Sequence, residues 1–213
     1  MKKIIALTFL AANVMSFAAT AGDSSDTSSP NDNDLSNQGS VQIFGPARYG
    51  KQNLSKVQVY GPAVFEGTTV AETAQIFGPM NAEDAKFKTL VVNGPCNLKS
   101  SSIHEAALNG PVKVRKVTVT GKIEINGPLM ARDSHFKGPI SIAARKITFE
   151  GSDAISLELR ASHNSDDKKG QIVILKNSII SGNIMFEQGN GKVYLMRGAK
   201  VKGQVKGGQI IEK

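Results

Sequence analysis

The apolar residues of this chain recur in a fixed pattern around a Gly-Pro dipeptide. Seven of the eight prolines stand in such a pair. Because proline has no other reason to recur at near-constant intervals, the pattern indicates a structural repeat. The glycines of these pairs are Gly45, Gly61, Gly78, Gly94, Gly110, Gly127 and Gly138. Their successive spacings are 16, 17, 16, 16, 17 and 11 residues.

Five columns of apolar or small residues appear when the first six glycines are aligned. They lie four and two residues before the glycine, and two, four and nine residues after it. The column two residues before the glycine holds Ile43, Val59, Ile76, Val92, Leu108 and Ile125. A sixth column, seven residues after the glycine, is mostly small and holds Gln52, Thr68, Ala85, Ser101, Val117 and Ser134. Paired columns are two residues apart, which is the period of a strand and not of a helix.

The repeat predicts an all-β fold, a single-stranded β-helix (β-solenoid) with triangular coils of 16–17 residues. Each coil is expected to hold three short strands. The Gly-Pro pair forms a corner, because glycine accepts unusual backbone angles and proline suits the first residue of a strand. Strands of successive coils pair about 4.8 Å apart, so roughly ten coils give a rod of about 45–50 Å.

The regular repeats cover residues 41–139, and the apolar pairs of residues 140–213 are less evenly spaced. These pairs predict further, less regular coils, with a small antiparallel cap as the alternative. The polar segment Ser162–Gly170 (SHNSDDKKG) predicts an exposed loop. The Gly-Asn-Gly at Gly189–Gly191 is a turn signal.

The coil length, the short Val- and Ile-rich strands and the closing segment VKGQVKGGQI resemble the bactofilins, a family of polymer-forming cytoskeletal proteins. The resemblance covers most of residues 41–210. It implies a right-handed β-helix that polymerises end to end and scaffolds cell-shape machinery. This chain differs from that family in two features. Bactofilins are cytosolic and have no cleaved signal sequence, and the Gly-Pro corner is not typical of them.

The N-terminus predicts export. A short positive start is followed by a short apolar run, and Ala19-Thr20-Ala21 fits the small-residue site of a signal peptidase. Cleavage near Ala21 would remove residues 1–21 as a signal peptide and make Gly22 the mature N-terminus. The protein is then periplasmic or secreted. No transmembrane segment is expected, because no later stretch is apolar enough to cross a bilayer.

Charge divides the mature chain into two parts. Residues 22–40 carry four Asp, no base and almost nothing apolar, which predicts a flexible acidic leader. Residues 41–213 hold 24 Lys and Arg against 14 Asp and Glu, a net charge of +10. A basic exported domain is attracted to anionic partners such as acidic polysaccharides or other cell-envelope polymers. Export and the absence of a nucleic-acid-binding module argue against nucleic acid.

No residue pattern predicts catalysis, a cofactor or a metal. The acidic residues share no column, and His104 and His135 are expected on the surface, two coils apart. Cys96, the single cysteine, occupies a core column and is expected to be a buried, inert thiol. Parallel β-helices do include polysaccharide lyases and hydrolases, so an enzyme acting on polysaccharides stays an alternative.

Two sets of residues are candidates for surface binding. Strand parity points three aromatic residues outward, just before the first three corner glycines: Phe44, Tyr60 and Phe77. They form either a platform for a sugar ring or another chain, or a self-stacking ladder continued by Asn93, Asn109 and Asn126. The basic candidates for contact with an anionic polymer are Arg48, Lys113, Lys86, Lys88, Lys137, Lys200, Lys202 and Lys206.

These observations favour a non-enzymatic structural protein of the cell envelope. Unpaired backbone at the ends of a solenoid invites end-to-end association, so a homo-oligomer formed in this way is one expected partner. The alternative is a glycan- or envelope-binding module such as an adhesin. The second alternative is the polysaccharide-active enzyme.

Overall fold

The computed structural model describes residues 38–161 and 170–213, and in these ranges every regular element is a β-strand. The predicted signal peptide 1–21, residues 22–37 of the predicted leader and residues 162–169 of the predicted loop lie outside the described residues. The first strand begins at Gln38, three residues before the predicted start of the solenoid domain. Each strand pairs in parallel with its counterpart in the next coil, which confirms the β-solenoid.

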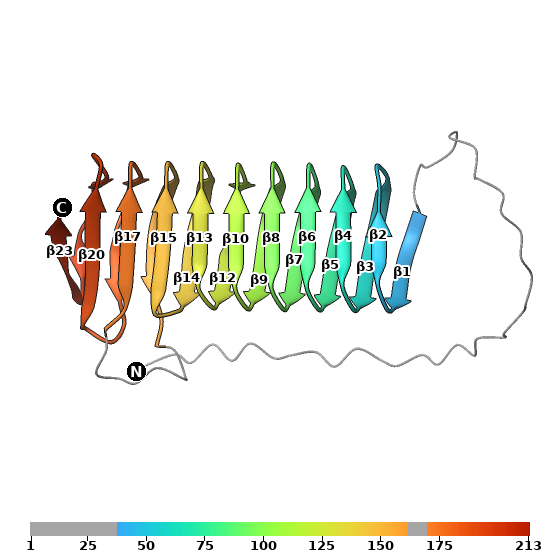
Figure 1. Cartoon of the computed structure of the whole chain (residues 1–213), viewed down its shortest axis with the longest axis horizontal. Helices are drawn as coiled ribbons and strands as arrows, with labels where there is room; N and C mark the ends of the chain where they lie inside the picture. The colour runs from blue at the N-terminus through green and yellow to red at the C-terminus, as the bar shows by residue number, and fades with distance from the viewer. Residues whose placement is uncertain (1–37, 162–169) are drawn as a thin grey trace, which may run out of the picture. The chain divides into compact units, whose positions relative to one another are not determined.

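Two parallel ladders run along the stack (Figure 1). The ten-stranded ladder has one strand per coil: β2 (Ala47–Tyr49), β4 (Ala63–Glu66), β6 (Met80–Glu83), β8 (Cys96–Lys99), β10 (Val112–Arg115), β13 (Leu129–Arg132), β15 (Lys146–Glu150), β17 (Ile172–Lys176), β20 (Gly191–Met196) and β23 (Gly208–Glu212). The other ladder comprises β1 (Gln38–Phe44), β3 (Asn53–Tyr60), β5 (Thr69–Phe77), β7 (Lys86–Asn93), β9 (Ser102–Asn109), β11 (Thr118–Val119), β12 (Ile123–Asn126), β14 (His135–Ala143), β16 (Asp153–Leu159), β18 (Ile179–Ile180), β19 (Ile184–Phe186), β21 (Lys200–Val201) and β22 (Val205–Lys206).

The prediction of three separate short strands in every coil needs a correction. In the early coils the second and third sides form one longer strand, and its register shifts within the strand, as between Leu54 and Lys56 of β3. The shift marks a bend, and β11 and β12 occupy the same two sides as separate strands in a later coil. The coil therefore has three sides, as predicted, but backbone pairing continues around one of its corners.

The predicted apolar columns form one continuous core. All five columns are buried in the second to sixth coils, and Val59, for example, is 0% exposed. In the first coil Val41 and Ile43 are only partly buried, because no described coil lies on their outer side. The inward-facing residues alternate with exposed ones along each strand, as a two-residue period requires.

The Gly-Pro corner allows backbone to lie directly on backbone. From Gly61 to Gly127 the corner glycines have φ between +142° and +154°, where side-chain-bearing residues are strained. A Cβ added to any of the five would lie 2.3–2.6 Å from the carbonyl oxygen of the preceding corner glycine. Proline keeps its acceptor in this ladder, since the amide of Ala63 donates to the carbonyl of Pro79 at 2.9 Å. Glycine is therefore required at this corner by both dihedral angle and space.

A second corner, six residues after the glycine, was not predicted. Its residues adopt the left-handed conformation with φ of 47–69°, and they are Gly67, Asp84, Ser100, Lys116, Asp133, Gly151, Asn177 and Arg197. Gly, Asn and Asp tolerate this conformation best, and they fill five of these eight positions. That enrichment is a signal that alignment of the coils could have revealed.

Buried hydroxyls satisfy the backbone beside this second corner. Ser101, Ser134, Ser152 and Ser178 each donate to the carbonyl two residues earlier at 2.7–3.0 Å. Each also accepts a bond of 3.0–3.1 Å from the backbone amide at the same position of the preceding coil. A buried amide left without a partner costs about 1–3 kcal/mol, so the small polar column stabilises the stack.

The C-terminal segment continues the same stack. Strands β17, β20 and β23 pair in parallel with the preceding coils, so the alternative of an antiparallel cap is wrong. The turn signal at Gly189–Gly191 covers the end of the connection between β19 and β20 and the first residue of β20. In Figure 1 the strands of the ten-stranded ladder lie nearer the viewer and point upward, while the chain advances from right to left. This arrangement makes the coils right-handed.

The corner predicts a difference between two glycine-to-alanine substitutions. Gly45 has φ +124° but nothing within 4 Å of its added Cβ, so Gly45→Ala tests conformational strain alone, about 1–3 kcal/mol. Gly94→Ala adds a clash with the carbonyl of Gly78, and we expect a loss of about 4 kcal/mol or more. Urea unfolding of dilute protein measures both. Equal losses of stability in the two variants would show that the close backbone contact at Gly94 adds nothing to the cost of the strained dihedral angle.

Candidate binding surfaces

The aromatic candidates form a continuous ring stack. The ring centroids of Phe44 and Tyr60 are 4.9 Å apart and nearly parallel at 6°, and those of Tyr60 and Phe77 are 4.8 Å apart at 4°. The register of β1, β3 and β5 places the three residues directly beside one another. The expected self-stacking ladder is therefore present.

Stacking determines which part of each ring a ligand could reach. Both faces of Tyr60 are covered by its two neighbours, so it presents only its edge and its hydroxyl. A sugar ring stacks on an aromatic face, and the most accessible face in this ladder belongs to Phe44, which is 78% exposed at the first coil. The ladder therefore offers an aromatic surface toward the N-terminal end of the rod.

Asparagines continue the ladder, as the sequence predicts. The side-chain amide of Asn109 donates to Asn93 at 2.8 Å, and that of Asn126 donates to Asn109 at 2.6 Å. Arg160 then donates to the Asn126 oxygen at 3.1 Å and ends the row. The amide groups use one another as partners along the stack, which is the role expected of an amide ladder.

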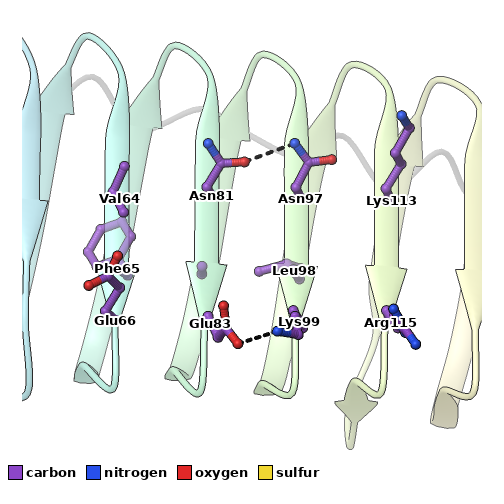
Figure 2. A pocket seen from close by; sticks show the side chains of 11 residues that line it. Val64, Phe65, Glu66, Asn81, Glu83, Asn97, Leu98, Lys99, Lys113 and Arg115 are labelled. Carbon is purple, nitrogen blue, oxygen red and sulfur yellow. Dashed lines mark hydrogen bonds and ion pairs between the residues drawn. The ribbon is translucent and has the colours of Figure 1, made fainter.

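A shallow hollow of about 270 Å³ lies on the outer side of β4, β6, β8 and β10 (Figure 2). The Asn97 amide donates to Asn81 at 2.9 Å, and Lys99 forms an ion pair with Glu83. The sequence candidate Lys113 and its neighbour Arg115 project from β10 at one edge of the hollow. Neither has an acidic partner among the described residues, so this edge of the hollow is cationic.

The fold separates most of the basic candidates. Arg48 shares the outward column of Lys113, but three coils lie between them, and Arg48 is paired with Glu66 at 2.7 Å. Lys86 and Lys88 of β7 are likewise separated from Lys137 of β14 by intervening coils. All of these lysines are exposed on the sides of the rod. They do not form one binding site.

The C-terminal candidates, in contrast, all lie in the last coil, where Lys200 and Lys202 line one hollow and Lys206 lines another. Lys200, Lys202 and Lys206 belong to the last strands of their ladder or directly follow them. From Gly191 onward the chain has six basic side chains and one acidic side chain, Glu212. The six are exposed, and within the described ranges none forms an ion pair: Lys192, Arg197, Lys200, Lys202, Lys206 and Lys213. The sequence reasoning missed Lys192, Arg197 and Lys213, although a count of charge per coil would have found them.

The remaining candidate chemistry is dispersed. Cys96 is fully buried, and this burial raises the pKa of its thiol to about 12. His104 lies within 2.9 Å of the Thr120 hydroxyl and His135 within 3.2 Å of the Asp153 carboxylate, both on the surface. In the described part of the chain no three His, Cys, Asp or Glu residues lie close enough to hold a metal ion.

The fold defines the class of this protein as a parallel β-solenoid. No family model, no curated protein and no solved structure matches the chain. A helix of the length and apolarity that a membrane span requires does not occur within residues 38–161 or 170–213.

The ring stack predicts a larger loss of stability at its middle than at its end. Tyr60→Ala removes two stacked contacts and Phe44→Ala removes one, and each is worth about 0.5–1.5 kcal/mol beyond the area buried. Denaturant unfolding should therefore show a loss for Tyr60→Ala at least twice that for Phe44→Ala. Equal losses would show that the stack contributes no stability of its own.

The buried thiol predicts protection from alkylation and a specific pH dependence. Cys96 should react with iodoacetamide only after unfolding, because both its burial and its raised pKa suppress the thiolate. The unfolded thiol ionises near pH 8.5, so its contribution to stability is complete below that pH and is lost as the pH rises toward 12. Cys96→Val should flatten this loss between about pH 9 and 11 in unfolding measurements. Rapid alkylation of folded protein would contradict this prediction.

Proposed function

We propose that this protein is an exported, non-enzymatic scaffold whose rods associate end to end in the cell envelope or outside the cell. The proposal adopts from the bactofilin resemblance only the polymerising behaviour. The supporting observation is that the two ends of the stack differ from its sides in backbone pairing, and that residues of the core columns are only partly buried at the ends, as Ile43 and Val201 are.

Within residues 38–161 and 170–213, both ladders end in unpaired strands. In the described ranges β1 and β2 have no pairing partner on their outer side, and neither do β21, β22 and β23 at the other end. Unpaired strand edges are templates for another chain. The same ends expose apolar groups, with Phe44 at the first coil and Ile210, 46% exposed, at the last.

The sides of the rod are engaged in contacts along the stack. Ring stacking, amide ladders and ion pairs such as Arg132 with Glu150 at 3.1 Å join equivalent positions of neighbouring coils. These contacts support a stiff rod, which is the property that a scaffold requires. Association through the ends would lengthen the rod without disturbing them.

The proposal predicts that assembly depends on the last coil. Ile210→Lys places a charge among the exposed apolar groups of the C-terminal end and should abolish the concentration-dependent oligomers that we expect from the chain beginning at Gly22. Sedimentation velocity over a hundredfold range of concentration measures this effect.

The matched control is Ile155→Lys on the side of the rod. Ile155 is 47% exposed, nearly the same as Ile210, so the two substitutions alter a similar apolar surface. The control variant should assemble like the parent chain. A parent chain that stays monomeric throughout, or equal loss of assembly in both variants, would overturn the proposal.

A further inference from the structure

We propose that the acidic segment 22–37 of one copy binds the basic C-terminal end of a second copy, which makes the association head to tail. This inference rests on the proposed end-to-end assembly and adds its polarity and the segment that determines it. The inference starts from the surface of the last coil and from the charge that precedes the first.

The C-terminal end has an apolar floor and a basic rim. A hollow of about 490 Å³ is lined by Leu195, Val201 and Ile210, with Arg197, Lys200 and Lys202 and the single carboxylate of Glu212 around it. Lys213 also lines this hollow, and its ammonium lies 4.9 Å from the centre of the Tyr194 ring. Such a surface suits a partner that supplies carboxylates.

Charge disfavours the association of two C-terminal ends with each other. Each end has six basic side chains and one acidic one from Gly191 onward, so two facing ends would bring about ten net positive charges together. Immediately before β1, by contrast, residues 22–37 have four carboxylates and no base. The two ends of one chain are therefore complementary, and each is poorly complementary to itself.

The short distance in sequence between the last two aspartates of the segment and β1 indicates that the segment binds a second copy and not its own chain. Asp32 and Asp34 stand six and four residues before Gln38, so they reach at most about 20 Å from the N-terminal end. Ten coils at about 4.8 Å place the chain's own C-terminal end about 43 Å away. Asp32 and Asp34, which are two of the four carboxylates, therefore cannot reach the C-terminal end of their own chain. They can reach the C-terminal end of another copy that adjoins β1.

Head-to-tail contact also continues the backbone pattern. One ladder runs from β1 to β21 and the other from β2 to β23, so a second copy placed in this way keeps every strand parallel. At the C-terminal end a hollow of about 580 Å³ is lined mainly by glycines, including Gly191 and Gly208 at the starts of β20 and β23. Gly45 at the other end has open space where later corner glycines meet a preceding one.

The direct test is binding of a fluorescent peptide that corresponds to residues 22–37. The receptor is the chain from Gly22 in which Asp23, Asp26, Asp32 and Asp34 are replaced by Asn, so that its own segment does not compete. Arg197→Gln, Lys200→Gln and Lys202→Gln together should weaken binding about tenfold, because each exposed ion pair contributes modestly. Fluorescence anisotropy measures the affinity, and 1 M salt should weaken it, since screening then acts within about 3 Å.

The matched control removes the same number of charges from the side of the rod. Lys86→Gln, Lys88→Gln and Lys137→Gln together should change the affinity of the peptide less than twofold. Equal weakening by both triple substitutions, or undiminished binding of a peptide with Asn in place of all four Asp, would overturn the inference. Peptide binding in a chain that never assembles would instead refute only the proposed function.

The head-to-tail polarity of the association can be tested separately with two variants that are blocked at opposite ends. Phe44→Lys blocks the N-terminal end and Ile210→Lys blocks the C-terminal end, so each variant should be monomeric alone. Mixed, they should form a dimer through the one free end of each, which sedimentation velocity detects. Dimers of either variant by itself would show that an end pairs with its own kind, and head-to-tail polarity would be wrong.

Discussion

The first six coils depend on direct contact between backbones at the Gly-Pro corner. An added Cβ at Gly94 or Gly110 would lie within 2.6 Å of the carbonyl oxygen of the glycine before it. Since no side chain separates the coils there, their spacing at the corner is that of a backbone ladder. The strands on either side share this spacing, and equivalent residues of successive coils therefore remain in register.

Fixed register gives every side chain an equivalent neighbour one strand spacing away. Aromatic rings then stack, as at Tyr60, and amides donate to amides, as at Asn109. Opposite charges at such positions form ion pairs, as in Glu83 with Lys99 and Arg132 with Glu150. The buried serines follow the same rule, because the Ser152 hydroxyl accepts a hydrogen bond from the backbone amide of Ser134 in the preceding coil. Repetition of the sequence thus reflects repetition of the environment.

The apolar columns could be predicted because burial depends on a period of two and on the position of the corner. Val92 and Cys96 lie in the core for that reason. Ring orientation could not be predicted, since outward parity at Tyr60 does not tell whether its face or its edge meets solvent. The left-handed corner at Asp84 and the hydroxyl bonds of Ser134 depend on backbone angles that apolar periodicity does not encode. The C-terminal coils were ambiguous because Gly127 is the last glycine at this corner: Gly138 lies within β14, and the later coils continue the ladder without a Gly-Pro corner.

The same repetition explains why association should use the ends. Along the sides, a ligand must compete with contacts that the coils already make with one another, such as the pair between Asn81 and Asn97. Among the described residues an end coil has a neighbour on one side only, and some of its inward residues are therefore only partly buried. Val59 is fully buried in the second coil, whereas Ile43 in the same column of the first coil is not. A second copy at the end would restore the missing neighbour in every column at once, and no site on the side of the rod offers a comparable gain.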